Sequence, residues 1–221
     1  MAMQTRALAD FLPLLVPNAP AVPAPVAEQA LRLAAVEFCE RTRCWRHITE
    51  RTLRRAESCI VAPEYAAIFE IESATFDGVL LEATQFSDFA QGSAETSPAA
   101  PRYVTQAGPD TVTVYPFQEG QLILSLFLKP RSGTDGYTPS NYDDDIAEPG
   151  NQVPDFLFVQ HAEAIVAGAL ERVLNIPGQT YTNPARAAEY KMMFDRAVNG
   201  HFARNLRGQH RAATRVRPNH F

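Results

Sequence analysis

Cysteine is scarce in this sequence, and long apolar runs are absent. The 221 residues include three cysteines, Cys39, Cys44 and Cys59, and no two of them have Cys-x-x-Cys spacing. An odd number of cysteines with no leader segment is typical of synthesis in a reducing compartment. The first apolar run, residues 11–16, is interrupted by Pro13 and is too short for a signal sequence or a membrane span. We therefore expect a soluble protein without an export signal or a lipid anchor.

Motifs for catalysis are missing as well. No glycine-rich loop of the kind that cradles phosphate occurs, and no serine or cysteine lies in a recognisable nucleophile turn. Asp155, His161 and Glu163 come nearest to an acid–base set. However, Glu163 follows His161 by two positions and would point to another face of a helix. The sequence therefore predicts neither enzymatic activity nor a cofactor.

The cysteines could serve as ligands of a zinc ion. Cys39, Cys44, His47 and Cys59 offer the right ligand atoms. They fall on a predicted helix end, a corner and the start of a strand, so nothing in their spacing makes four ligands converge. We interpret them as ordinary core or surface residues and expect no bound metal.

The predicted helices lie near both ends of the chain. Residues 26–42 form one, and the other two, which begin near Pro154 and Asn183-Pro184, are joined by a corner at residues 176–178. Gly168 falls in the middle of a helix, where a close crossing of another backbone would explain it. The predicted core and scaffold residues of this bundle are Leu31, Phe38, Phe158, Ile165, Leu170, Tyr190, Phe194 and Val198.

The middle of the chain has the period of β-strands. Five strands are predicted, at residues 67–73, 79–84, 103–106, 111–115 and 121–129. Asp77-Gly78 is a hairpin signal between the first two. The even-numbered leucines of residues 122–128 share one face, with Ile123 and Phe127 on the other, which is typical of a central or covered strand.

These patterns predict an α+β fold in which a small antiparallel β module interrupts an antiparallel helical bundle. With 46% apolar residues, the chain can build a core of one or two domains. The expected divisions are an extended proline-rich segment at 1–25, a first helix at 26–44, the β module with an acidic loop at 45–152, a helical hairpin at 153–206 and a basic arm at 207–221. The acidic loop holds Asp143, Asp144 and Asp145, which lack the ligand alternation of a calcium loop and favour a solvated segment.

The basic arm is the strongest local charge pattern in a chain whose formal net charge is only −5. No acidic residue follows Asp195. The arginines near the end, with one terminal aromatic residue, are Arg204, Arg207, Arg211, Arg215, Arg217 and Phe221. Such a segment can dock onto an acidic protein groove, contact nucleic acid or simply be solvated.

Both ends of the chain resemble the adaptor proteins of tailed bacteriophages. The resemblance lies in a pattern of helices, corners and aromatic residues. It is carried by Asp10–Pro13, Ala30–Thr42, Trp45, Pro154–Phe158, His161–Ile165, Gly168–Leu170, Leu174, Pro177-Gly178, Asn183–Ala185, Tyr190 and Phe194–Ala197.

The resemblance implies a structural protein of the virion neck, made in the cytoplasm of the host bacterium. It implies a homo-oligomeric ring, a dodecamer, beneath the portal protein, with the arm docked on the portal. The next tail component would be a nozzle, a stopper or a tail tube, and the acidic loop would face that component or the channel. Genomic DNA would pass through without sequence-specific binding. The alternative from the residues alone is a soluble nucleic-acid-binding module that uses the arginine-rich arm.

Overall fold

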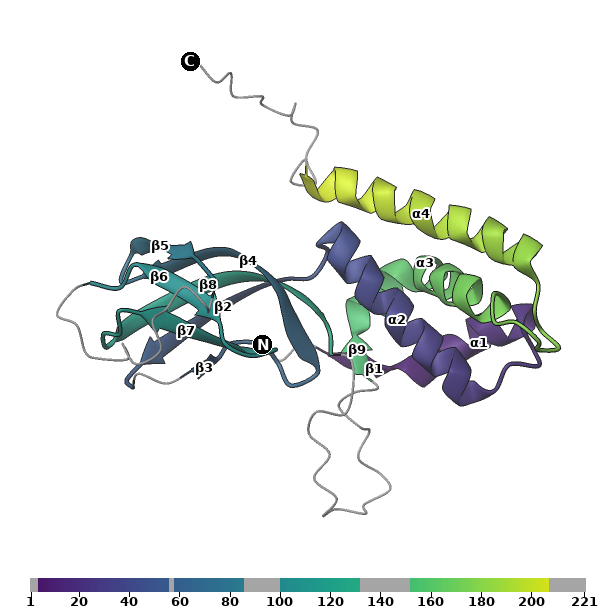
Figure 1. The fold of residues 1–221 in the computed structure, drawn as a ribbon, viewed down its shortest axis with the longest axis horizontal. Coiled ribbons are helices and arrows are strands. Elements are labelled where there is room, and N and C mark those ends of the chain that lie inside the picture. Colours follow the sequence, from purple (N-terminus) through teal and green to yellow (C-terminus); the bar gives the residue numbers. More distant parts are fainter. Residues whose placement is uncertain (1–3, 56–57, 86–99, 132–151, 207–221) are drawn as a thin grey trace, which may run out of the picture.

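The molecule consists of a curved β-sheet and a group of helices packed beyond one end of it (Figure 1). The computed structural model describes residues 4–55, 58–85, 100–131 and 152–206, with side chains as far as residue 203. The sheet is built from the middle of the chain and the helical part from both ends.

The sheet has seven strands in the order β2-β8-β4-β5-β6-β7-β3. Neighbours are antiparallel except β5 and β6, which are parallel. At its edges, Arg51 Nε donates a hydrogen bond to the Ile60 carbonyl oxygen at 3.0 Å, which nearly closes the sheet. The strands are β2 Arg46–Leu53, β3 Cys59–Ile60, β4 Ala66–Phe76, β5 Val79–Ala83, β6 Tyr103–Gln106, β7 Thr111–Tyr115 and β8 Gly120–Pro130.

The fold predicted from the sequence, a helical bundle with a small β module, is wrong. The sheet is a major part of the molecule, and its two longest strands, β4 and β8, have 11 residues each. The five predicted strands are present, but the prediction lacks β2 and β3. In β2, charged and hydroxyl residues fill most positions, and only Thr49 and Leu53 are buried. Pairing with β8 forms this strand, and a pattern of apolar residues could not reveal it.

The interior strand β8, which lies between β2 and β4, has the two faces that the sequence predicts. Leu122, Leu124, Leu126 and Leu128 are buried inside the curved sheet, at 0–1% exposure. Ile123, on the outer face, is 40% exposed. These leucines form the core of the sheet, and the outer face is left partly apolar.

The predicted hairpin between β4 and β5 is confirmed. Phe76 pairs with Val79. Asp77 and Gly78 between them have φ angles of 46° and 83°. Two positive φ angles define the type I′ turn, whose twist matches that of the flanking strands.

Three long helices form the helical part: α2 Ala24–Thr42, α3 Asp155–Leu174 and α4 Pro184–Leu206. α3 is the central one, and its residues 165–170 are all buried. Asn183 caps α4 as predicted, because its Oδ1 accepts a hydrogen bond from the Arg186 backbone N–H at 3.1 Å.

Gly168 of α3 lies close to both neighbouring helices. A Cβ atom added to it would lie 2.8 Å from the Phe194 ring on α4 and 3.1 Å from Ala34 Cβ on α2. The lack of a side chain therefore lets α3 pack between its two neighbours, which accounts for a glycine in a buried helix.

The N-terminal segment is compact, so the predicted extended segment is a second error. β1 (Thr5–Ala7) pairs with β9 (Gln152–Pro154), and the short helices η1 (Leu8–Phe11), α1 (Leu12–Leu15) and η2 (Val16–Asn18) follow. Pro13 and Pro17 occupy first-turn positions of α1 and η2, where a missing N–H costs nothing. Prolines that forbid a long helix therefore still permit these short turns.

Candidate functional site

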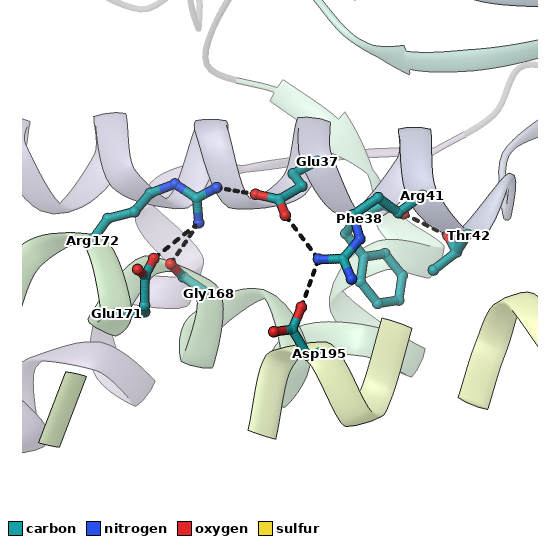
Figure 2. A network of polar contacts seen from close by, with 8 residues as sticks. All are labelled: Glu37, Phe38, Arg41, Thr42, Gly168, Glu171, Arg172 and Asp195. Carbon is teal, nitrogen blue, oxygen red and sulfur yellow. Dashed lines mark hydrogen bonds and ion pairs between the residues drawn. The ribbon is translucent and has the colours of Figure 1, made fainter. Parts of the chain in front are cut away.

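A network of polar contacts joins α2, α3 and α4 (Figure 2). Arg41 on α2 donates hydrogen bonds to Glu37 Oε1 at 2.9 Å and to Asp195 Oδ1 on α4 at 2.7 Å. Arg172 on α3 donates to the other oxygen of Glu37 and, at 2.7 Å, to the Gly168 carbonyl oxygen. Glu37 thus lies between two arginines, and every helix contributes at least one charge.

This network orders the helices more than it stabilises them. Its charged side chains in the interhelical pairs are 25–36% exposed. Exposed ion pairs of this kind contribute about 0.2–1 kcal/mol each. The hydrogen bond to Asp195 raises the pKa of Arg41 above its ordinary value, with burial acting in the opposite direction. Directional contacts to a permanent cation fix the register of α2 against α4.

Aromatic rings fill the space between the same helices. The Phe38 ring centroid lies 4.9 Å from that of His161 on α3, and 6.3 Å and 5.6 Å from those of Phe194 and His201 on α4. His161 and His201 meet edge to face at 4.5 Å. His161 is only 7% exposed. It therefore belongs to the packing of the three helices and does not face a solvent cleft.

The N-terminal segment is fastened to the start of α3. Arg6 Nε donates to Asp155 Oδ1 at 2.7 Å, and its guanidinium lies 4.5 Å from the centre of the Phe158 ring. Phe11, which is fully buried, meets the Phe158 ring edge to face at 5.0 Å. The segment thus lies across the helices of its own chain.

The junction between the sheet and the helices is made by one aromatic cluster and two ion pairs. Trp45 is 1% exposed. Its ring stacks on that of Tyr65, with 5.9 Å between the ring centroids, and meets the Phe156 ring edge to face, with 6.4 Å between the centroids. The ion pairs are Lys129–Glu40 at 2.7 Å and Arg43–Glu70 at 2.8 Å.

Among the exposed large apolar side chains of the described residues, two groups lie on α4 and on the outer face of the sheet. On α4, Met192 and Met193 are 67% and 58% exposed. On the outer face of the sheet, Leu80, Ile48 and Ile123 are 71%, 69% and 40% exposed. Exposed apolar side chains that gather on one surface are typical of protein interfaces. These surfaces are not among the features expected from the sequence, although adjacent methionines on an otherwise polar helix face could have indicated the first.

Comparison with known families decides what kind of protein this is. A family model described as SU10 adaptor protein matches residues 3–219. The chain belongs to the SU10 adaptor protein family. No curated protein matches the chain. The resemblance to bacteriophage adaptors is therefore confirmed, and it extends over almost the whole chain.

Membership in this family makes the protein a structural component of a bacteriophage virion with an adaptor role. It implies a location in the virion neck and contact with portal and tail components in general. A structural role of this kind also suggests a protein that is not an enzyme. No helix in the described part of the adaptor is long and apolar enough to cross a membrane.

The structure places most of the predicted scaffold residues in the helical core. Phe158 and Tyr190 are partly buried and pack against that core. The others are at most 4% exposed: Leu31, Phe38, Ile165, Leu170, Phe194 and Val198. Arg204 belongs to the last turn of α4 by its backbone. The remaining predicted arm residues (Arg207, Arg211, Arg215, Arg217 and Phe221) and the acidic triplet Asp143–Asp145 lie outside the described residues.

The candidate catalytic residues are separated by their contacts. Asp155 binds Arg6, whereas His161 packs among aromatic rings and Glu163 is exposed. Within the described ranges, no group of three or more His, Cys, Asp or Glu side chains could hold a metal ion. Burial raises the pKa of Cys39 well above its ordinary value, and a hydrogen bond from Cys39 lowers that of Cys44.

We predict that the adaptor purified without chelators carries no stoichiometric metal. Replacing Cys39 with alanine and both Cys44 and Cys59 with serine should leave assembly intact, because the cysteines have no spacing for a shared ion. Only Cys39 is fully buried, so the packing loss should be about 1 kcal/mol. Elemental analysis and thermal unfolding measure both quantities. About one zinc per chain, lost together with the fold in the triple variant, would contradict this prediction.

Proposed function

We propose that the adaptor forms a ring, a dodecamer, beneath the portal protein, where it joins the capsid to the tail and lets the genome pass. The observation that carries this proposal is the family match over residues 3–219. A ring that closes by rotation uses two different surfaces of each subunit, one for each neighbour.

The helical part has the rigidity that such a subunit needs. Its core helix α3 is buried between α2 and α4, and the Arg41 and Arg172 contacts cross all three helices. The N-terminal segment adds a further link within the same chain. A helical part that keeps its shape under load can transmit force between capsid and tail.

We assign the basic arm, residues 207–221, to docking on the portal. It follows directly after α4 and its charges are all positive, so an acidic groove would attract it. We assign the acidic triplet at Asp143–Asp145 to the surface that faces the channel or the next tail component. Negative charge there would repel passing DNA over roughly a Debye length of ~8 Å.

Deleting residues 207–221 should abolish attachment to portal-bearing heads and leave the fold intact. The fold should stay intact because the described core is complete without this segment. Attachment can be measured by sedimenting the heads with the adaptor, and the fold by thermal unfolding. A matched control replaces Arg204 and the four arginines of residues 207–217 with lysine, which keeps the charge.

Wild-type attachment of the truncated adaptor would contradict the docking role of the arm. A second outcome would favour the nucleic-acid-binding alternative. In that case the full chain would bind DNA with strong salt dependence, and the deletion would abolish this binding without affecting attachment to the heads.

A further inference from the structure

Two exposed apolar surfaces lie on different parts of the adaptor. The α4 surface consists of Met192, Met193 and Arg196. The sheet surface consists of Ile48, Leu80 and Ile123 with Glu50 and Glu82. We infer that in the ring the α4 surface of one subunit packs on the sheet surface of a second copy. This inference rests on the ring that we propose above.

The α4 surface lies opposite the buried face of the helix. Ala187, Phe194 and Val198 point into the core. Arg196 follows Met192 by four positions and Met193 by three, so its side chain lies beside both methionines. Unbranched methionines adapt to irregular partner surfaces. The α4 surface is thus an adaptable apolar pair with a cation at its C-terminal side, and Glu189 lies one turn before it.

Strand register assembles the sheet surface. Leu80 pairs with Thr75, Thr75 pairs with Ile123, and Ile123 pairs with Glu50, so these four side chains form one row across β5, β4, β8 and β2. Ile48 lies two residues from Glu50 in β2, and Glu82 lies two residues from Leu80 in β5. Both side chains are therefore on the same face as the row. The row begins with Leu80, contains Ile123 and ends in the Glu50 carboxylate.

The charges of the two surfaces are complementary. Arg196 makes no ion pair with any residue whose side chain the structure describes, and neither do Glu50 and Glu82 in the same part of the chain. Within the described ranges, Glu50 accepts a side-chain hydrogen bond from the neutral Gln121 amide and from no cation. Packing the sheet surface on its own copy would bring like charges together, whereas packing it on the α4 surface pairs Arg196 with a carboxylate.

The two surfaces also meet the symmetry requirement. α4 belongs to the helical part and the sheet row to the other part of the molecule (Figure 1). A contact between such unlike surfaces is heterologous, and repetition of the contact generates a ring if the rotation closes. One subunit would then offer its α4 surface to one neighbour and its sheet surface to the other.

Cross-linking between copies tests this pairing. Three full-length variants are compared with the wild type: Met193→Cys, Leu80→Cys and the double variant. Each is assembled at increasing concentration, alone and on portal-bearing heads of the phage that encodes the adaptor, and is then treated with a short bis-maleimide. The wild type reports any reaction of Cys44 and Cys59.

The double variant should give a ladder of covalent oligomers, and each single variant should stay at the wild-type level. Cross-linked dimers from a single variant would show that like surfaces meet and would overturn the inference. If the wild type forms rings and the double variant gives no ladder, the inferred pairing of the two surfaces would be overturned, whereas the proposed ring would stand. If the wild type forms no ring under either condition, the proposed function itself fails.

A charge exchange provides a second, independent test. Arg196→Glu and Glu50→Arg should each reduce assembly at least tenfold, and the double exchange should restore most of it. Both side chains are exposed, so thermal unfolding should not change. Equal assembly of all three variants would contradict the pairing of Arg196 with Glu50.

Discussion

Replacing Phe194 with alanine is expected to lower the free energy of unfolding by about 3–5 kcal/mol, the usual cost of emptying a buried aromatic site. Phe194 is 4% exposed, and its ring faces both Phe38 and the backbone of α3 at Gly168. The cavity would open where α2, α3 and α4 meet, and rigid helices cannot collapse to fill it. Chemical denaturation with fluorescence or circular dichroism measures the loss.

The adjacent residue supplies the control. Met193→Ala removes a side chain that is 58% exposed on the same helix. Its effect on stability should stay within about 0.5 kcal/mol. If the two substitutions destabilised the adaptor equally, Phe194 could not be the centre of the helical core.

Gly168→Ala should destabilise the adaptor by about 1–3 kcal/mol, although alanine is the better helix former by roughly 1 kcal/mol. A Cβ atom at this position would lie 2.8 Å from the Phe194 ring. The clash exceeds the gain in helix propensity because the ring is confined between helices. Denaturant titration of the variant gives the sign directly.

For a second glycine, the expected effect of alanine on stability has the opposite sign. Gly200 lies in α4, and apart from its own helix backbone and chain neighbours no described atom lies within 4 Å of an added Cβ. Gly200→Ala should therefore stabilise the adaptor by about 0.5–1 kcal/mol.

A double variant tests the clash at Gly168 directly. Gly168→Ala should lose most of its destabilising effect in a Phe194→Ala background, since the ring that the new Cβ would strike is gone. A stabilising Gly168→Ala would mean that the helices are not as close as described.

The helices were more predictable than the sheet. The periodic apolar residues of α3 and α4, the proline at the start of α3 and the Asn183 cap of α4 act within a single helix and can be read along the chain. The interhelical network could not be read in the same way, because Glu37 and Arg172 are 135 positions apart. The sequence shows an i, i+4 pair at Glu37 and Arg41, but not that Asp195 completes it.

The surfaces proposed for assembly show the same division. The residues Leu80, Ile123 and Glu50 belong to three strands that are far apart in the sequence, and only the register brings them into one row. β2 itself has too few apolar residues to be recognised from its own pattern. The arm, by contrast, is evident from charge alone, because no acidic residue follows Asp195.

The sequence by itself determined the family, the long helices, five of the strands, the hairpin at Asp77-Gly78 and the basic end of the chain. Each of these depends on neighbouring residues, through periodicity, turn chemistry or local charge. Only the tertiary structure decided the size and curvature of the sheet, the compact N-terminal segment and the closeness of α3 to its neighbours. These features depend on which distant segments share a buried face, and a polar strand or a proline-rich turn forms only when such a partner is present.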